Sequence, residues 1–409
     1  MIDKLDVHLQ HYDQELFCGQ LLMEGKQVYF KYAKEYIAKG FNLSPFKLTF
    51  DQKVQFSDVV YFDHLFGVFY DSLPDGWGQL LMQRYFHEQN IPTNERNILL
   101  QLSSLSNTSK GGLIYTPSLQ KDNAEIVKTI DQLHKEAMEF YSQDSQKSID
   151  DLFVLGGSSG GARPKIDAWI HKGNQDVRYQ ENTDPNYELH IVKFKSDTDY
   201  EDIAAIEYCY MLMAERAGIV VSPSKLIKGQ EGRSYFATKR FDRLGAKRIH
   251  TISVSGLLHD NFRNSNIDYG HIMDAAFQLE RNFDAYERVL RLAIFNVLAH
   301  NKDDHSKNFS FITDRDGKFS LAPAYDLTFS YGINTYRSTA VAGEQRSPSL
   351  KNVKALADHF GVKNVDTIVA EVHESIKSWS NFAVEHGVSN RSLEEISKNL
   401  KDTASYFFS

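Results

Sequence analysis

A long apolar helix pattern that ends in a polar loop constrains the fold of this chain more than any other feature. Apolar residues recur at helical spacing from residue 285 to 300, and residues 301–308 are then all polar or charged. Two short strand-like runs follow between 309 and 322, and the second leads to Asp326. The order of helix, polar loop and hairpin therefore predicts that Asp326 returns close to the loop.

The polar loop carries the residue types that phosphoryl transfer uses. Asp303 and Asn308 are separated by four residues. Protein kinases place at this interval the Asp that accepts a hydroxyl proton and the Asn that binds Mg²⁺. Because Mg²⁺ takes oxygen ligands, Asp326 is the expected second ligand. Lys307 is a candidate catalytic cation, which would neutralise charge on a transferring phosphate.

The same loop admits two other interpretations. His300, Asp303, Asp304 and His305 are ordinary ligand types for zinc, manganese or iron, which would suit a metal-dependent hydrolase. Taken singly, the histidine also suits a helix C-terminus and the acids suit a solvated turn. The kinase interpretation gains weight because a glycine-rich turn, a strand lysine and a helix glutamate precede the loop in the order found in kinases.

The glycine-rich turn spans residues 156–165 and is expected to lie between two strands, 152–155 and 166–170. Its glycines let backbone N–H groups approach phosphate oxygens. The segment is not a Walker loop, because Ala162 and Arg163 replace the Lys and Ser/Thr that would follow the last glycine. A simple hairpin turn is the alternative. The candidate nucleotide-binding glycines are Gly156, Gly157, Gly160 and Gly161.

The strand lysine and the helix glutamate are Lys193 and Glu207. Lys193 follows two β-branched residues in the strand pattern 187–195, and Glu207 falls on the apolar stripe of the next helix. A carboxylate on a buried stripe needs a partner, and Lys193 is the candidate. Such a pair holds the α and β phosphates in kinases. The alternative is a glutamate that reaches solvent at the edge of the stripe.

Composition narrows the class of protein. The 54 acidic and 46 basic side chains give a net charge of −8, and 42% of the residues are hydrophobic. This composition excludes a disordered chain and argues against a surface devoted to nucleic acid. The N-terminus lacks the apolar core of a signal peptide, and no window resembles a membrane span. With only Cys18 and Cys209, read as buried thiols, we expect a soluble, cytoplasmic protein without membrane contact.

The pattern along the chain predicts an α+β fold of two lobes with a cleft between them. Residues 1–150 begin with short antiparallel strands, include a helix over 122–141 and end in a polar joint at 144–150. Residues 151–243 carry the glycine-rich turn and the strand lysine. Residues 244–409 are mostly helical and contain the polar loop.

Several motifs together resemble the HipA family of bacterial toxin kinases. The resemblance implies a two-lobed, protein-kinase-like fold with an extra N-terminal β subdomain over 1–150, a kinase N-lobe over 151–243 and a helical C-lobe over 244–409. It also implies an ATP- and Mg²⁺-dependent Ser/Thr protein kinase within a type II toxin–antitoxin pair. The motifs are Leu73–Gly78, Ser158–Lys165, His190–Lys193, Arg240–Arg243, Asp303–Phe309 and Tyr325–Asp326.

The resemblance also implies a role for individual residues. Asp303 becomes the catalytic base, Asn308 and Asp326 the Mg²⁺ ligands, and Lys193 a contact of the ATP phosphates. Residues 237–241 become the hinge beneath adenine. The remaining implied nucleotide contacts are Glu207, Lys239, Phe241 and His305, and the implied autophosphorylation sites are Ser158 and Ser159.

The family implies partners as well. They are a small HipB-like DNA-binding antitoxin, through which alone the chain would reach DNA, and a protein substrate of the aminoacyl-tRNA synthetase class. This chain departs from the family pattern at Asp304, where glycine is frequent, and in its two adjacent loop serines. Two alternatives stay open: a small-molecule kinase of the aminoglycoside or choline type, and a catalytically silent binding module.

Overall fold

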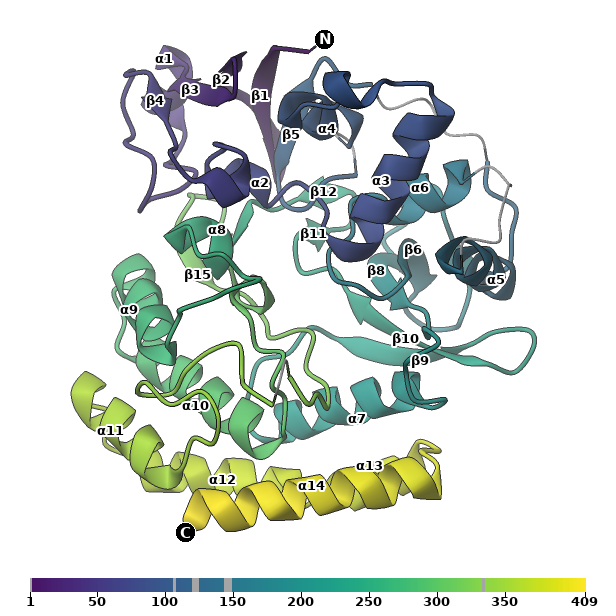
Figure 1. Ribbon diagram of the computed structural model, residues 1–409, viewed down its shortest axis with the longest axis vertical. Helices are drawn as coiled ribbons and strands as arrows, with labels where there is room; N and C mark the ends of the chain where they lie inside the picture. Colours follow the sequence, from purple (N-terminus) through teal and green to yellow (C-terminus); the bar gives the residue numbers. More distant parts are fainter. Residues whose placement is uncertain (1, 106–107, 120–124, 143–148, 333–334) are drawn as a thin grey trace.

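Two five-stranded antiparallel sheets and a set of helices make up the molecule in the computed structural model, which describes residues 2–409 except 106–107, 120–124, 143–148 and 333–334 (Figure 1). The first sheet has the strand order β4-β3-β2-β1-β5. The alternation expected near the N-terminus is present, because Leu5, Val7 and Leu9 of β1 are all buried. Its strands are β1 (Lys4–His11), β2 (Gln14–Glu24), β3 (Gln27–Tyr32), β4 (Gln55–Phe56) and β5 (Leu113–Thr116).

The second sheet has the order β7-β6-β8-β10-β9. Alternate side chains of its strands face opposite layers: Tyr235 and Ala237 pack with α3, α5 and α6, whereas Phe236 packs with α7. The strands are β6 (Lys165–His171), β7 (Val177–Arg178), β8 (Tyr187–Lys193), β9 (Ser224–Lys228) and β10 (Ser234–Lys239). The helices are α3 (Gly76–Glu88), α5 (Ile130–Tyr141), α6 (Asp150–Gly156) and α7 (Ile203–Arg216).

Two predicted elements are wrong in type or extent. Residues 152–155 belong to helix α6 and form no strand, because Asp150 and Asp151 favour a helix N-terminus and Leu152, Phe153 and Leu155 bury one face. The helix predicted over 122–141 begins only at residue 130, where Thr129 caps it with Gln132. The polar joint predicted at 144–150 lies mostly outside the described residues.

The C-terminal half is largely helical, as predicted, and contains a small sheet of order β13-β14-β15. Figure 1 shows α12–α14 at the end of the molecule opposite the N-terminal sheet. None of the helices formed by the described residues is long and apolar enough to cross a membrane. The main elements are α8 (Val254–Leu258), α9 (Tyr269–Glu280), α10 (Asp284–Leu298), α11 (Leu350–Phe360), α12 (Val365–Ile376), α13 (Trp379–Glu385), α14 (Asn390–Phe408), β13 (Thr251–Ser253), β14 (Ser310–Thr313) and β15 (Phe319–Leu321).

One hydrophobic core joins the N-terminal sheet to the C-terminal helices, and a second lies between α3, α5, α6 and the second sheet. Where α2 (Gly67–Tyr70) meets α8, a Cβ on Gly67 would lie 2.2 Å from the carbonyl oxygen of Gly256. The backbones of the two helices therefore touch directly. The division of the chain at residues 150 and 243 stays a prediction.

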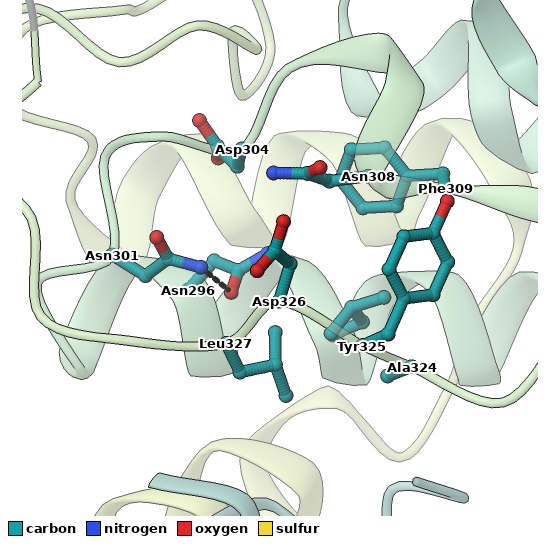
Figure 2. Close-up of a pocket in the computed structure, with 10 residues that line it drawn as sticks. Asn296, Asn301, Asp304, Asn308, Phe309, Ala324, Tyr325, Asp326 and Leu327 are labelled. Carbon is teal, nitrogen blue, oxygen red and sulfur yellow. Dashed lines mark hydrogen bonds between the residues drawn. The ribbon is translucent and has the colours of Figure 1, made fainter. Parts of the chain in front are cut away.

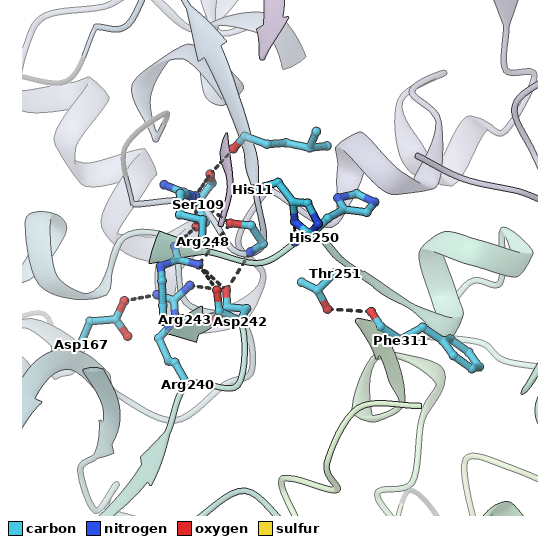
Figure 3. Close-up of polar contacts among 12 residues, drawn as sticks. His11, Ser109, Asp167, Arg240, Asp242, Arg243, Arg248, His250, Thr251 and Phe311 are labelled. Carbon is cyan, nitrogen blue, oxygen red and sulfur yellow. Dashed lines mark hydrogen bonds and ion pairs between the residues drawn. The ribbon is translucent and has the colours of Figure 1, made fainter. Parts of the chain in front are cut away.

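Three buried arginines and two aspartates form a second junction, between the N-terminal part and the end of β10 (Figure 3). Arg243 donates to the carbonyl oxygens of Ser109 at 2.9 Å and Gly111 at 3.1 Å. Asp242 in turn accepts from the Gly111 amide at 2.7 Å. Buried charges persist only when they are paired in this way. The network consists of Arg240, Arg243, Arg248, Asp167 and Asp242.

Candidate active site

The polar loop after α10 is held in shape by its own side chains. His300 has a positive φ of 53°, which turns the chain sharply at the helix end. The Asn301 side-chain amide then donates to Asn296 Oδ1 at 3.0 Å. Asn308 Nδ2 donates to the carbonyl oxygen of Asp303 at 2.7 Å. The two residues expected to work together are therefore at opposite ends of one closed loop.

Asp303 is the exposed member of the loop. Its side chain reaches solvent, whereas the adjacent Asp304 is 1% exposed. The surrounding protein removes part of the hydration of Asp303, and with the nearby Asp326 and Asp304 carboxylates this raises its pKa, although His305 opposes the shift. A carboxylate that is accessible and more basic than usual suits a general base.

Asp304 has a different role, because it anchors the segment that follows Asp326. Its carboxylate accepts from the Tyr269 hydroxyl at 2.8 Å and from the Ser338 and Thr339 amides at 3.1 and 3.2 Å. Arg337 lies 3.3 Å away, and both side chains of this ion pair are almost fully buried. The acidic residue noted as a departure from the family pattern therefore joins the loop to residues 337–339.

The expected ion pair between the strand lysine and the helix glutamate is present. Lys193 Nζ lies 3.0 Å from Glu207 Oε2 and also donates to Asp326. Burial alone would raise the pKa of Asp326, but the Lys193 and Lys165 ammonium groups bring it well below its usual range. Figure 2 shows the Asp326 carboxylate directed toward Asn308, and both residues line one small pocket.

Sequence reasoning missed two cations beside this pair. Arg163, at the end of the glycine-rich turn, also binds Glu207, and its Nε lies 2.9 Å from Asp199. Lys165 donates to the carbonyl oxygen of Gly160 at 2.6 Å, and burial lowers its pKa to about 8. The acidic partners of Arg163 are more than thirty residues away, and Lys165 binds a backbone carbonyl, so no local pattern indicated these contacts.

The glycine-rich turn follows a helix and precedes a strand, so the hairpin alternative is wrong. Gly156 ends α6 and Gly157 caps it, where a Cβ would lie 2.6 Å from Lys165 O and 2.4 Å from Phe153 O, respectively. These two glycines are therefore required by packing. Gly160 and Gly161 form the loop itself, and Gly161 has a φ of 78°. The two loop serines are buried, with exposures of 4% for Ser158 and 6% for Ser159.

Lys307 does not stand free at the surface of the site. Its ammonium lies 2.8 Å from Asp75 Oδ2, and both side chains are 9% exposed. The ammonium also lies 4.5 Å from the centre of the Phe262 ring. Lys307 is thus held by the turn at residues 73–78, and its contact with a phosphate stays a prediction.

The remaining predicted nucleotide contacts come from the end of β10 and from the loop itself. Lys239 at the end of β10 binds Glu188 at 2.6 Å, and the Phe241 ring packs 5.3 Å from that of Tyr325. The His305 ring packs 5.6 Å from Phe262. None of these contacts contradicts a role in nucleotide binding, which stays a prediction for all three residues.

The metal-hydrolase interpretation of the loop finds no geometric support. His300 turns away to Thr403 of α14, where its Nδ1 lies 2.7 Å from the hydroxyl oxygen. The Asp304 carboxylate already forms a buried ion pair with Arg337. Among the described residues no group of three or more His, Cys, Asp or Glu side chains could hold a metal ion.

The fold is a two-lobed α+β fold of the protein-kinase-like class. The features that define it are the second sheet with helix α7, the ion pair between Lys193 and Glu207, and the loop after α10. The sequence model of the HipA-like C-terminal domain matches residues 157–380, and that of the HipA N-terminal domain matches residues 6–116. The chain therefore belongs to the HipA family.

Individual relatives agree with this assignment. A Haemophilus influenzae protein named "Putative kinase" is 29% identical over 186 residues, which cover 42% of this chain and 52% of that protein. The serine/threonine-protein kinase toxin HipA of Shewanella oneidensis is 24% identical over 241 residues, which cover 53% of this chain and 51% of the toxin. The chain thus spans about half the length of the curated relatives it matches.

A solved structure extends the likeness to the whole chain. It is the complex of HipA, HipB and operator DNA from Shewanella oneidensis, one chain of which matches with a TM-score of 0.68 and 18% sequence identity. The match covers 98% of this chain and 95% of that chain. At this identity the likeness shows the fold.

Proposed function

We propose that this protein is an ATP- and Mg²⁺-dependent Ser/Thr protein kinase that acts as the growth-arrest toxin of a toxin–antitoxin pair. The observation that carries the proposal is the position of the Lys193 ammonium between the carboxylates of Glu207 and Asp326. Kinases use this arrangement to hold ATP phosphates next to a metal-binding aspartate. Family membership supports the same activity.

The residues at the predicted metal site fit Mg²⁺. The side-chain nitrogen of Asn308 donates to the Asp303 carbonyl oxygen, so the side-chain oxygen of Asn308 can act as a ligand. The Asp326 carboxylate lines the same pocket, and the neighbouring Lys193 and Lys165 ammonium groups lower its pKa and favour its ionised form. Two oxygen donors of this kind are what Mg²⁺ accepts when phosphates complete its shell. Mg²⁺ would supply charge neutralisation at the phosphates.

The chain's own residues would then divide the work of phosphoryl transfer. Lys193, held by Glu207, would orient the α and β phosphates. Asp303 would accept the proton of the substrate hydroxyl, for which its raised pKa and exposure are suited. Asn308 would fix the loop that carries Asp303, because it bonds the backbone carbonyl of that residue.

The partner would be a small HipB-like antitoxin that binds DNA. The relative with the same fold was solved together with HipB and operator DNA. The net charge of −8 agrees with a chain that reaches DNA through such a partner.

Autophosphorylation would fall on Ser158 or Ser159. Because both side chains are buried, the loop must move outward before either hydroxyl can react. A phosphate there adds a charge of about −1.5 to −2, which would repel the phosphates of ATP and switch the kinase off. A modified form that binds ATP as tightly as the unmodified form would contradict this account.

Incubation with Mg-ATP followed by intact-mass measurement and peptide mapping tests the proposal. Wild type should gain one phosphate on residues 157–162, and Asp303→Ala should gain none. Asp316→Ala is the matched control, because Asp316 is exposed in the β14–β15 turn, away from the loop. A wild type that consumes no ATP would indicate the silent binding module, and transfer to amino alcohols or sugars would indicate a small-molecule kinase.

A further inference from the structure

The turn at residues 73–78, whose last three residues begin helix α3, contacts the backbone of the glycine-rich loop. The Trp77 amide donates to the Gly161 carbonyl at 2.8 Å, and the Gly161 amide donates to the Asp75 carboxylate. The Trp77 indole nitrogen also donates to Lys165 O at 3.0 Å, where the loop enters β6. Three bonds therefore tie this turn, from the N-terminal part of the chain, to a loop more than eighty residues away.

The contact is too close for side chains. A Cβ on Gly76 would lie 2.3 Å from Gly161 O, and one on Gly78 would lie 2.5 Å from Ser159 O. The turn therefore lies directly against the loop backbone, on the stretch that carries the serines. Any added side chain in this contact would push the loop away from the turn.

Asp75 joins the loop to the catalytic segment as well. One carboxylate oxygen accepts from Gly161, and the other lies 2.8 Å from the ammonium of Lys307, next to Asn308. Burial opposes ionisation of Asp75, but Lys307 and Lys110 lower its pKa to below the ordinary range. A buried, ionised carboxylate thus bridges two segments that the proposed reaction requires to be close together.

We propose that Asp75 is a positioning residue that clamps the glycine-rich loop inward over the site and couples it to the catalytic loop through Lys307. The link to ATP rests on the proposed function. The clamp itself is a property of the fold, and it gives the N-terminal part of the chain a role in the site. Release of Asp75 from Gly161 would be the step that exposes Ser158 and Ser159.

Hydrogen–deuterium exchange of the full chain without nucleotide tests the clamp. In Asp75→Asn, peptides over 157–164 should exchange roughly tenfold faster or more, because a charge-assisted bond to a loop amide is weakened. Asp71→Asn is the matched control, since Asp71 lies in the same segment but accepts from the Ser253 amide and hydroxyl, both at 2.7 Å. Unchanged loop exchange in Asp75→Asn, or an equal rise in Asp71→Asn, would overturn the clamp.

A second variant distinguishes release of the loop from destabilisation of the whole chain. Gly78→Ala alters no charge and pushes on the loop through Ser159 O, so it should also raise exchange over 157–164 while leaving α10 unchanged. If Asp75→Asn raises exchange throughout the chain, the test rests on Gly78→Ala. Unchanged exchange over residues 157–164 in Gly78→Ala would then overturn the proposal.

Kinetics give an independent readout. Asp75→Asn should raise the KM for ATP roughly tenfold, since the free energy of one charge-assisted bond corresponds to about that factor. If Asp75→Asn shows faster loop exchange but an unchanged KM for ATP, the clamp does not affect nucleotide binding. A wild type without ATPase or kinase activity would contradict the proposed function. The exchange comparison would still test the clamp, because it is done without nucleotide.

Discussion

At the scale of single residues, Asp304 anchors the loop to residues 337–339 through its buried carboxylate. In Asp304→Asn the buried Arg337 guanidinium loses its carboxylate, and we expect the free energy of unfolding to fall by about 3 kcal/mol. Urea denaturation measures this change. Asp366→Asn removes a solvent-exposed pair with Lys354 and should cost less than about 1 kcal/mol. Equal losses in the two variants would contradict the anchoring role.

The pair of Lys193 and Glu207 was predictable because helical spacing places the glutamate on a buried stripe, where a charge must find a partner. The contacts of Asp75 with Lys307 and Gly161 were not predictable, because they join segments that no local periodicity relates. In the sequence, Asp304 stood out as a candidate metal ligand and as a departure from a family pattern, and neither indicated its buried ion pair. Its environment became apparent once residues 337–339 were seen to fold back onto it.

At the scale of elements, helix α14 contacts the segments that precede α7 and follow Asp326. Glu395 accepts from the hydroxyls of Tyr200 at 2.8 Å and Tyr331 at 2.9 Å, which precede α7 and follow Asp326, respectively. Glu395→Leu removes the acceptor of the half-buried Tyr200 hydroxyl, whereas Tyr331 is exposed and its hydroxyl also lies near Asn399. The free energy of unfolding should therefore fall by about 1 kcal/mol in urea titrations. Glu394→Leu, at the exposed neighbouring position, is the control and should change it by less than about 0.5 kcal/mol.

An element with strong periodicity, such as α10, was predictable over most of its length. The pattern at 152–155 predicts a strand because a short apolar run fits both periods, whereas the two preceding aspartates favour the helix α6 that forms. The consequence for the site was direct. A helix before the glycines gives Gly156 and Gly157 a packing role, and their contact with phosphate stays a prediction.

At the scale of the whole molecule, a buried histidine makes the junction between the N-terminal sheet and the C-terminal half sensitive to acid. His250 Nε2 lies 3.0 Å from Leu43 O, the His250 amide meets His11 Nδ1 at 3.3 Å, and burial lowers the His250 pKa to about 4. The unfolded chain takes up a proton below pH 6.5, whereas the folded chain does not until about pH 4. Stability therefore falls as the pH drops through this window.

His250→Gln should remove up to about 3 kcal/mol of this pH dependence between pH 6.5 and 4, as measured by urea titrations at several pH values. His87→Gln replaces an exposed histidine outside the junction and is the control for the loss of a histidine side chain. A slope that is equal in wild type and His250→Gln would contradict the assignment.

The two-lobed arrangement was predictable from the order of the motifs, since glycine loop, strand lysine, helix glutamate and polar loop follow one another along the chain. How the first 150 residues pack was not predictable. They contribute strands to the core of the C-terminal helices and helices to the core of the second sheet, and such division depends on contacts between distant segments.

The meeting of Gly67 with Gly256 has a consequence for exchanging parts between members of the family. A methyl group on Gly67 would lie 2.2 Å from Gly256 O, and one on Gly256 would lie 2.4 Å from the Asp71 carboxylate and 2.8 Å from Gly67 O, so the two positions form a matched pair across the junction. A chimera that takes residues 1–116 from one member and the rest from another should assemble only when both parents have glycine there. In a saturation mutagenesis screen, both positions should therefore reject every substitution, although neither lies in the catalytic loop.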